Sequence, residues 1–190
     1  MLCSCDGSMI PLLLERWTST PTAAEMAVLD RAVGPVIDVG CGPGRHVREL
    51  AARGVVALGI DISPDAVAVA HTLGSAVLQR SVFARVPNEG RWRTALLMDG
   101  NIGIGGDAAA LLVRLRRVME PHGSVVAEVE QPGEATRVDM VRLERAEEVG
   151  PWFRWARVSL DGIDEIAERA HLTRAWTFEG EGRWFVQLTS

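Results

Sequence analysis

Short apolar segments that alternate with helical patterns constrain the fold of this chain more than any other feature. Five of these segments predict buried strands, at residues 35–40, 55–61, 76–82, 94–100 and 124–130. Buried strands that alternate with helices form parallel sheets, and the crossover helices cover both faces of the sheet. Because such crossovers are right-handed, the natural arrangement is a doubly wound sheet.

Local signals predict the helices that connect these strands. Residues 45–54 have a helical pattern, and Ser63, followed by a proline, starts another helix that runs to about residue 72. Asp107 can cap a third helix over residues 108–120. These helices supply the crossovers that a parallel sheet needs.

The N-terminal region also has a helical pattern. Residues 9–32 show apolar side chains at helical spacing, and Thr20 and Pro21 form an N-cap followed by a first-turn proline. We therefore expect residues 1–33 to form an N-terminal helical cap.

The last third of the chain changes character. Residues 131–158 are an insertion whose periodicity leaves two alternatives open, a strand pair or an inserted flap. Residues 160–172 have the pattern of an amphipathic helix, and residues 173–178 and 183–188 predict a terminal hairpin. The expected fold is a single α/β domain over residues 1–190. It has a doubly wound, mostly parallel seven-stranded sheet, helices on both faces and a C-terminal antiparallel hairpin.

Composition excludes several classes of protein. The net charge is −5, which argues against a nucleic-acid partner, and all 20 basic residues are arginine, a bias that suits a GC-rich bacterial genome. Three cysteines make no disulfide framework, so the cytoplasm is the expected compartment, and the lone pair Cys3 and Cys5 predicts no metal site. No apolar run reaches the roughly 20 residues that cross a membrane.

A glycine turn follows the first predicted strand, with glycine at positions 40, 42 and 44. At the carboxyl end of a parallel strand, such a turn lets a ligand approach the backbone. Asp61 ends the next strand, about twenty residues on, where an acid can accept hydrogen bonds from ribose hydroxyls. Together they predict a ribonucleoside site, although a plain strand-to-helix connection remains the alternative.

The same segment disfavours a dinucleotide. The dinucleotide fingerprint has a third glycine where this chain has Arg45. Asp38 lies just before the turn, and an acid there repels a phosphate but suits a cationic amino-acid group.

At residues 36–44, VIDVGCGPG resembles the first motif of the class I S-adenosylmethionine-dependent methyltransferases. GIDIS at 59–63 is similar to the segment that ends in their ribose-binding acid, and residues 121–130 to their fifth strand. The resemblance covers about residues 35–130. It implies S-adenosyl-L-methionine as cofactor and S-adenosyl-L-homocysteine as product.

The resemblance also implies roles for individual residues. The glycines of the turn would shape the methionine side, Asp38 would hold the amino end, and Asp61 the ribose, with Ile62 packing on adenine. Ser81, followed by Val82, stands where members of the family often carry an acid that contacts adenine. The full expected cofactor set is Asp38, Gly40, Cys41, Gly42, Gly44, Asp61, Ile62, Ser81, Val82, Asp99 and Gly100.

The segment 98–107 follows the fourth predicted strand and is rich in glycine and polar residues, and its glycines would let a ligand approach the backbone closely. It lacks the Pro-Pro-aromatic pattern of enzymes that methylate nucleobases, which favours a small-molecule acceptor. Asn101, Glu130 and His46 are the candidates to assist the reaction. The alternatives are that Glu130 is an exposed strand end and that His46 only covers the first turn of its helix.

Trp152, Phe153 and Trp155 cluster in the insertion. They could line an apolar acceptor pocket, close it as a lid, pack on the sheet edge or form the contact of a homodimer. The sequence thus predicts a cytoplasmic methyltransferase for a small apolar or aromatic metabolite, with no nucleic-acid or membrane partner. The alternatives are a regulator or partner subunit that binds the cofactor without turnover, or a different reaction such as a cyclisation.

Overall fold

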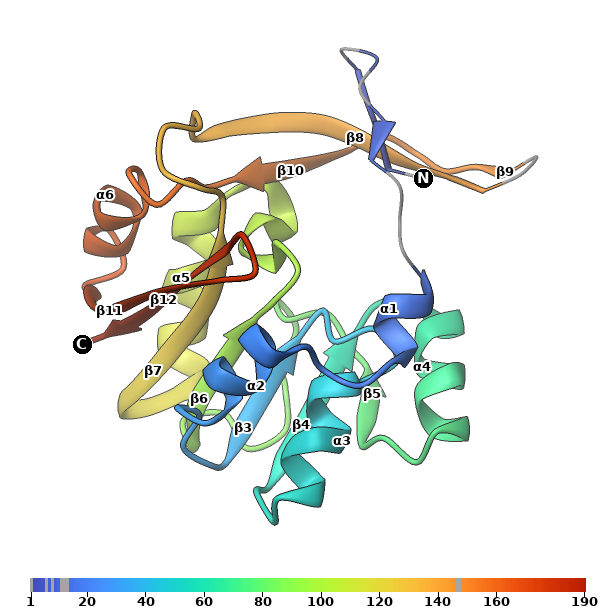
Figure 1. The fold of residues 1–190 in the computed structure, drawn as a ribbon, viewed down its shortest axis with the longest axis vertical. Helices are drawn as coiled ribbons and strands as arrows, with labels where there is room; N and C mark the ends of the chain where they lie inside the picture. The colour runs from blue at the N-terminus through green and yellow to red at the C-terminus, as the bar shows by residue number, and fades with distance from the viewer. Residues whose placement is uncertain (1, 6, 8, 11–13, 146–147) are drawn as a thin grey trace.

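The computed structural model describes residues 2–5, 7, 9–10, 14–145 and 148–190. Its main sheet has seven strands in the order β11-β12-β7-β6-β3-β4-β5 (Figure 1). The strands from β7 to β5 run parallel, and β12 pairs antiparallel with both β7 and β11. Their bounds are β3 Val36–Val39, β4 Ala57–Asp61, β5 Val77–Gln79, β6 Trp92–Leu97, β7 Met119–Val129, β11 Thr173–Gly180 and β12 Arg183–Thr189. The predicted fold class is confirmed.

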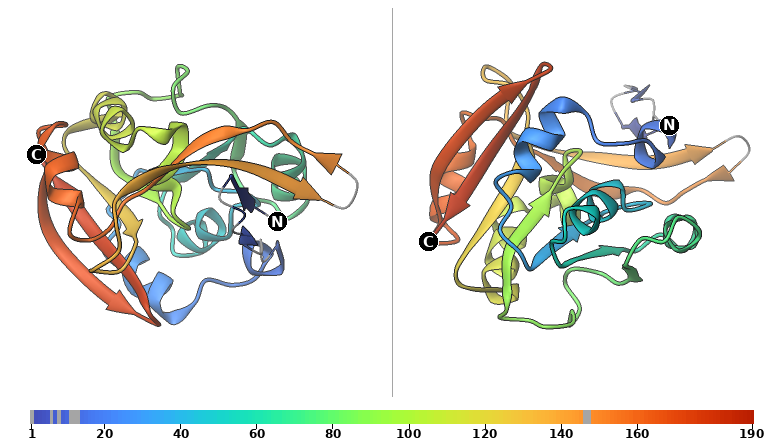
Figure 2. Two further views of the ribbon diagram at one scale, coloured as in Figure 1. Left: turned by 90° about the horizontal axis from the view of Figure 1, so that it is seen from above. Right: turned by 60° about the horizontal axis from the view of Figure 1, so that its bottom comes forward.

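The helices cover both faces of this sheet (Figure 2). Two predicted caps are correct: the Ser63 side chain accepts a hydrogen bond from the Ala66 amide, and Asp107 accepts one from the Ala110 amide. The helices are α1 Leu14–Thr18, α2 Ala23–Leu29, α3 Arg45–Ala52, α4 Pro64–Thr72, α5 Ala108–Val118 and α6 Ile163–Glu168, with a 3₁₀ segment, η1, at Asn101–Gly106.

Apolar side chains fill the core on the two faces of the sheet. Leu111 and Leu115 of α5 are fully buried with Ile37 of β3 on one face, and Val28 of α2 is buried with Phe185 of β12 on the other. Each such side chain contributes about 1.5–3 kcal/mol when it leaves water. This packing fixes the strand ends that carry the polar residues described below.

The N-terminal prediction of one helical region over residues 9–32 is wrong in part. Met9–Ile10 is a short strand, β2, that pairs with β1, Leu2–Ser4, and helices α1 and α2 are separate. The N-cap of α2 is Thr22 rather than Thr20. The reason is a capping box, in which the Thr22 hydroxyl accepts from the Glu25 amide and the Glu25 carboxylate accepts from the Thr22 amide.

The insertion contains an antiparallel strand pair, β8 Arg137–Arg145 and β10 Phe153–Arg157, which we call the flap. Strand β1 pairs with β8, and β9, Glu148–Val149, pairs with the far end of β8, so a second sheet of five strands forms. In Figure 1 the flap crosses above η1, and seen from above in Figure 2 it extends over the main sheet. The flap therefore lies on the side of the domain at which the parallel strands end.

Candidate cofactor site

The glycine turn after β3 has a left-handed backbone at each of its glycines, with φ of +71° at Gly40, +54° at Gly42 and +79° at Gly44. A Cβ at Gly40 would lie 2.7 Å from Nδ2 of Asn101, and one at Gly44 would lie 2.9 Å from Cβ of Ser75. A Cβ at Gly42 would meet nothing within 4 Å. Packing therefore requires glycine at two positions, while Gly42 presents bare backbone to open space.

Asp61 ties this turn to the end of β4. Its Oδ2 accepts a hydrogen bond from the Gly42 amide, and its Oδ1 accepts one from the Ser63 amide, each at 2.8 Å. A carboxylate oxygen has further lone pairs, so Asp61 can still accept from hydroxyl groups. The adjacent Ile62 side chain is 72% exposed, which leaves an apolar surface beside the carboxylate.

The residues after β5 divide between core and surface. Val82 is buried, and its carbonyl accepts a hydrogen bond from Nε of Arg114, while the Ser81 hydroxyl accepts from the Phe83 amide. Phe83 is half exposed and lies against Gly105 of η1, where an added Cβ would be 2.9 Å from its ring. Phe83 was not predicted as a site residue, although an aromatic side chain directly after the third predicted strand was a sequence signal that could have indicated it.

Cys41 packs inside the turn. Its Sγ lies so close to Gly59 of β4 that a Cβ there would clash with it. Burial raises the pKa of the Cys41 thiol, and the nearby carboxylates of Asp38 and Asp61 raise it further, so the thiol stays neutral.

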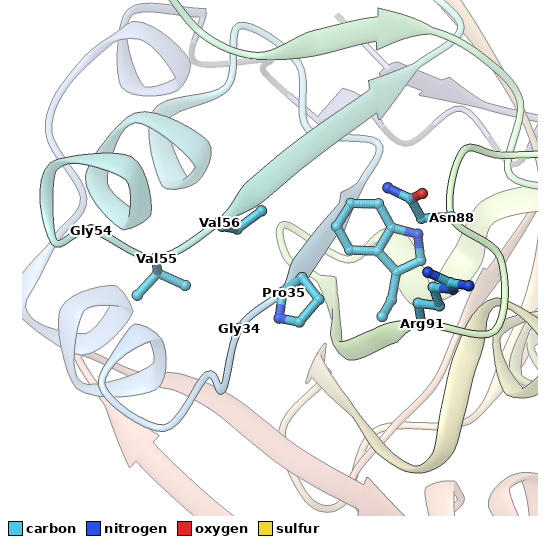
Figure 3. A pocket seen from close by; sticks show the side chains of 8 residues that line it. Gly34, Pro35, Gly54, Val55, Val56, Asn88 and Arg91 are labelled. Atoms are coloured by element: carbon cyan, nitrogen blue, oxygen red, sulfur yellow. The ribbon is translucent and has the colours of Figure 1, made fainter.

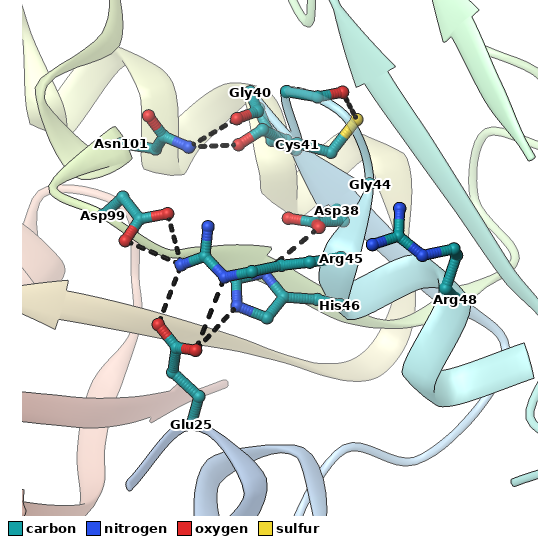
Figure 4. A network of polar contacts seen from close by, with 12 residues as sticks. Glu25, Asp38, Gly40, Cys41, Gly44, Arg45, His46, Arg48, Asp99 and Asn101 are labelled. Carbon is teal, nitrogen blue, oxygen red and sulfur yellow. Dashed lines mark hydrogen bonds and ion pairs between the residues drawn. The ribbon is translucent and has the colours of Figure 1, made fainter. Parts of the chain in front are cut away.

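A group of charged side chains, which we call the charged cluster, lies beside the glycine turn (Figure 4). At its centre, Arg45 of α3 donates to Glu25 of α2 at 2.8 Å and to Asp99, just after β6, at 2.7 Å. Arg183 of β12 donates to Glu25 and to Glu128 of β7, each at 2.5 Å. The members are Arg16, Glu25, Asp38, Arg45, His46, Asp99, Glu128 and Arg183.

Burial and pairing shift the pKa values of the cluster in opposite directions. Burial alone would raise the pKa of Glu25, but His46, with Nε2 3.8 Å from Oε2 of Glu25, and hydrogen bonds from Arg45 and Arg183 outweigh it and lower that pKa. Burial alone would lower the pKa of His46, but Asp38 and Glu25 outweigh it and raise that pKa. Pairing therefore favours the charged form of both side chains.

The predicted residues Asp99 and Gly100 have different surroundings. The Asp99 carboxylate is occupied by Arg45 and Arg183, and its amide donates to Glu128 at 2.6 Å. Gly100 has φ of +76°, and an added Cβ there would meet nothing within 4 Å. Asp99 thus links the end of β6 to side chains of α3, β7 and β12. Gly100, in contrast, presents open backbone as Gly42 does.

The predicted catalytic residues lie in three separate environments. Asn101 donates from Nδ2 to the carbonyls of Val39 and Gly40, at 2.9 Å each, and so holds the glycine turn. His46 is only 2% exposed, with Nδ1 3.5 Å from Oδ2 of Asp38. Both oxygens of Asp38 lack a hydrogen-bond partner among the described residues.

Glu130, the third candidate, lies at the base of the flap. Its carboxylate is 3.2 Å from Nη1 of Arg157, and its backbone bonds to Val158 and Leu160. It is not part of the charged cluster. The catalytic roles of Asn101, Glu130 and His46 stay predictions.

The glycine-rich segment η1 connects the turn to the flap. A Cβ at Gly103 would collide with the Ala156 carbonyl and lie 2.5 Å from Nε1 of Trp155, and one at Gly106 would collide with Cβ of Arg154. Strand β10 therefore lies directly on η1. Beside this contact, the rings of Trp155 and Phe153 meet edge to face at 6.2 Å.

A surface hollow of about 610 Å³ lies at the amino ends of the parallel strands, opposite the ends that carry the glycine turn (Figure 3). Ligands of open α/β sheets bind at the carboxyl ends of the strands, so this hollow is not the candidate site. The residues that line it precede or begin β3, β4 and β6: Gly34, Pro35, Gly54, Val55, Val56, Asn88, Arg91 and Trp92.

The described residues also bear on two other classes of site. No three His, Cys, Asp or Glu side chains in this part of the chain are placed to hold a metal ion. None of the helices found there is long and apolar enough to span a membrane.

The fold is shared with known proteins. A methyltransferase from Bacteroides fragilis, solved with S-adenosyl-L-homocysteine, has a TM-score of 0.84 at 21% identity, over 99% of this chain and 86% of that chain. The 1,6-didemethyltoxoflavin-N1-methyltransferase of Burkholderia thailandensis has a TM-score of 0.61 at 16% identity, over 82% and 70% of the two chains. A glycopeptide N-methyltransferase solved with S-adenosyl-L-methionine has a TM-score of 0.66 at 13% identity, over 90% and 95%.

No curated protein has a sequence that matches the chain. A family model described as a methyltransferase domain matches residues 36–123, the stretch from β3 into β7 that contains the glycine turn, Asp61 and Asp99. This match and the shared fold support the resemblance of the chain to the class I S-adenosylmethionine-dependent methyltransferases.

Proposed function

We propose that the protein transfers a methyl group from S-adenosyl-L-methionine to a small apolar or aromatic acceptor, bound between η1 and the flap. The observation that carries this proposal is the aromatic pair Phe153 and Trp155, which sits on the strand that packs against η1. Aromatic side chains of this kind recognise planar apolar molecules by stacking and edge contacts.

The residues present fit the cofactor. Gly42 and Gly100 present open backbone, Asp61 keeps acceptor capacity toward ribose hydroxyls, and Ile62 and Phe83 offer exposed apolar surface for adenine. When bound, the cofactor supplies an electrophilic methyl group on a positively charged sulfur. The rest of the site has to align an acceptor with that methyl group and exclude water.

We assign His46 and Asn101 to positioning rather than proton transfer. His46 is buried between the carboxylates of Asp38 and Glu25, so its ring is not within reach of an acceptor. Asn101 spends its amide donors on the carbonyls of the glycine turn. Glu130 has a side chain that is 42% exposed and is the remaining candidate to accept a proton, although Arg157 competes for it.

The kinds of acceptor seen among structural neighbours agree with a small-molecule reaction. One neighbour is named for methylation of 1,6-didemethyltoxoflavin and another for methylation of a glycopeptide. The fold alone does not fix the acceptor, so the argument rests on the aromatic pair in the flap.

The cofactor half of the proposal is tested by calorimetry with S-adenosyl-L-homocysteine. We expect Asp61→Ala to abolish binding while the circular dichroism spectrum is retained, because the ribose loses its acceptor. Unchanged affinity would remove the cofactor assignment. Ser63 caps α4 with its own side chain, so the variant keeps that helix start.

The acceptor half is tested by transfer of a labelled methyl group from the cofactor to a panel of small aromatic alcohols and amines. For any substrate found, Trp155→Ala should raise KM at least tenfold, whereas Trp152→Ala, a change to a 43% exposed ring stacked by Arg142, should not. Binding of cofactor without transfer to any compound would favour the alternative of a non-catalytic binder.

Two further expectations belong to this proposal. The cytoplasmic location follows from the cysteine content, and a homodimer follows from the exposed apolar residues of the flap, such as Met140 and Leu143. Light scattering on the purified protein measures the second. A monomer at micromolar concentration would contradict it.

A further inference from the structure

A chain of ion pairs, which we call the flap network, joins the base of the flap to the end of β7. Arg157 of β10 donates from Nε to Oδ2 of Asp139 on β8 at 3.0 Å, and from Nη1 to Oε1 of Glu130 at 3.2 Å. Nε of Arg137 donates to Oδ1 of Asp139 at 3.2 Å. The side chains of Arg157 and Asp139 are 20% and 15% exposed, so the centre of the flap network is largely shielded from water.

The flap network continues the face of the flap that carries the aromatic pair. Residues two apart in a strand share a face, so Phe153, Trp155 and Arg157 lie along one face of β10. The register pairs Trp155 with Asp139, which is therefore on the same face. An acceptor ring in contact with Trp155 would thus present its polar substituent to Arg157.

Glu130 extends the flap network toward the proposed cofactor side. Its backbone forms a parallel bridge to Ser159, so the extended conformation of β7 continues to this residue. By strand alternation, Glu130 and Glu128 share a face and are about 7 Å apart along the strand. Glu128 accepts from the Asp99 amide at 2.6 Å. The flap network therefore lies between the aromatic pair and the strand ends proposed to hold the cofactor.

Two polar groups of the flap network are unused and indicate one kind of nucleophile. Nη2 of Arg157 and Oε2 of Glu130 make no hydrogen bond within the part of the chain that the structure describes. The ion pair therefore offers one donor and one acceptor to the same ligand atom. A hydroxyl group fits both, because it has one hydrogen to donate and two lone pairs, so its oxygen can accept from Arg157 and still attack a methyl group. A neutral amine has a single lone pair, which the guanidinium would occupy.

We propose that the acceptor is an aromatic hydroxyl whose oxygen contacts both Arg157 and Glu130. Glu130 takes the O–H proton, the oxygen forms a bond to the methyl carbon, and the bond from that carbon to sulfur breaks with its electron pair staying on sulfur. The products are an aryl methyl ether and S-adenosyl-L-homocysteine, and Glu130 then releases the proton to water. Arg157 stabilises the negative charge that develops on the oxygen, and Asp139 positions Arg157. This inference rests on the proposal that the acceptor binds between η1 and the flap.

The test is methyl transfer to matched pairs of a phenol and the aniline with the same ring. In kcat/KM, the wild type should prefer the phenol by at least about 100-fold. Glu130→Gln keeps an oxygen for Arg157, so KM should change little, but kcat should fall about 100- to 1,000-fold for an ordinary phenol, whose pKa is about 10. A dinitrophenol is already ionised at neutral pH, so with this substrate the same variant should lose no activity.

The role of Arg157 is tested with two variants and a control. Arg157→Met should lower kcat/KM about 100-fold for both kinds of phenol, because both carry negative charge on the oxygen in the transition state. Arg157→Lys should restore part of this loss, since it keeps the charge without the fork. Arg154→Met is the matched control, because Arg154 lies on the opposite face of the same strand and is exposed; it should leave kcat/KM unchanged.

The outcomes separate this inference from the proposed function. Transfer to anilines as fast as to phenols would overturn the inference. So would an equal loss of activity in Glu130→Gln with the dinitrophenol and the ordinary phenol, since Glu130 would then only hold the flap in place. Transfer to non-aromatic acceptors alone, or cofactor binding without any transfer, would instead refute the proposed function and the inference with it.

Discussion

Replacing Glu25 with glutamine removes one negative charge from the centre of the charged cluster without changing the size of the side chain. Glu25 is 0% exposed, and its carboxylate contacts Arg45 and Arg183, which are also largely buried. Neither guanidinium can lose its proton at neutral pH, so the variant leaves positive charge buried with fewer partners.

The expected cost follows from this geometry. Removing one partner of a buried ion pair costs about 3–5 kcal/mol. Glutamine can still serve the capping box of α2, so that contribution is retained, whereas Glu25→Ala would also lose the cap, worth about 1 kcal/mol. A domain of this kind has a free energy of unfolding of about 5–15 kcal/mol, so Glu25→Gln should remain folded but be strongly destabilised.

The assay is urea unfolding at pH 7, followed by circular dichroism and by the fluorescence of the six tryptophans. With a slope of about 2 kcal/mol per molar, the midpoint should fall by roughly 1.5–2.5 M. Glu49→Gln is the control, because Glu49 pairs with Arg53 at a partly exposed site on α3 and its loss should cost at most about 1 kcal/mol.

A double variant separates the buried charge from other effects of the substitution. In Glu25→Gln with Arg45→Met, the cation is removed together with its acid, so part of the lost stability should return. The reasoning is refuted if Glu25→Gln costs no more than Glu49→Gln, or if the double variant is less stable than the sum of its single changes predicts.

Three further predictions follow from the site. Gly42→Ala and Gly54→Ala each put a Cβ on a left-handed backbone with open space around it, so each should lower the free energy of unfolding by about 1–2 kcal/mol. Only Gly42→Ala should weaken the binding of S-adenosyl-L-homocysteine in calorimetry, and equal affinities of the two variants would contradict this. The raised pKa of His46 gives stability that is complete below its usual pKa of 6.5 and is lost as pH rises through the folded value. The urea midpoint should therefore fall as the pH rises above 6.5, and less steeply in His46→Asn; identical slopes would exclude His46 as the cause. Gly103→Ala should displace the flap and increase amide hydrogen exchange in β10, and unchanged exchange would show that the close contact is not needed.

Local signals in the sequence were enough to predict the main sheet. The strands β3, β4, β6 and β7 are apolar runs that end in polar or glycine residues, and the caps Ser63 and Asp107 act within three residues of themselves. Such features depend on near neighbours in the chain, so the sequence contains them in full. The N-terminal strands β1 and β2 escaped prediction because β1 is held by pairing with β8, well over a hundred residues away.

The charged cluster could not be predicted for the same reason. Its centre joins Glu25, Arg45, Asp99, Glu128 and Arg183, which come from α2, α3, β7, β12 and the loop after β6. Apart from Asp99, which the resemblance assigned to the cofactor, each looks like an ordinary surface charge in its own segment. Burial of an ion depends on what the rest of the chain brings to it, and that information is not local.

The segment 98–107 shows how a correct pattern can point to the wrong cause. Its glycines predicted close approach of a ligand to the backbone, and Gly100 keeps that character. Gly103 and Gly106 instead admit strand β10, because glycine signals that something comes close without saying what. The consequence is that η1 contacts three parts of the site at once: the turn through Asn101, Phe83 through Gly105, and the flap through Gly103. These contacts link the position of the flap to that of the glycine turn, so the proposed cofactor and acceptor sides of the site would share one support.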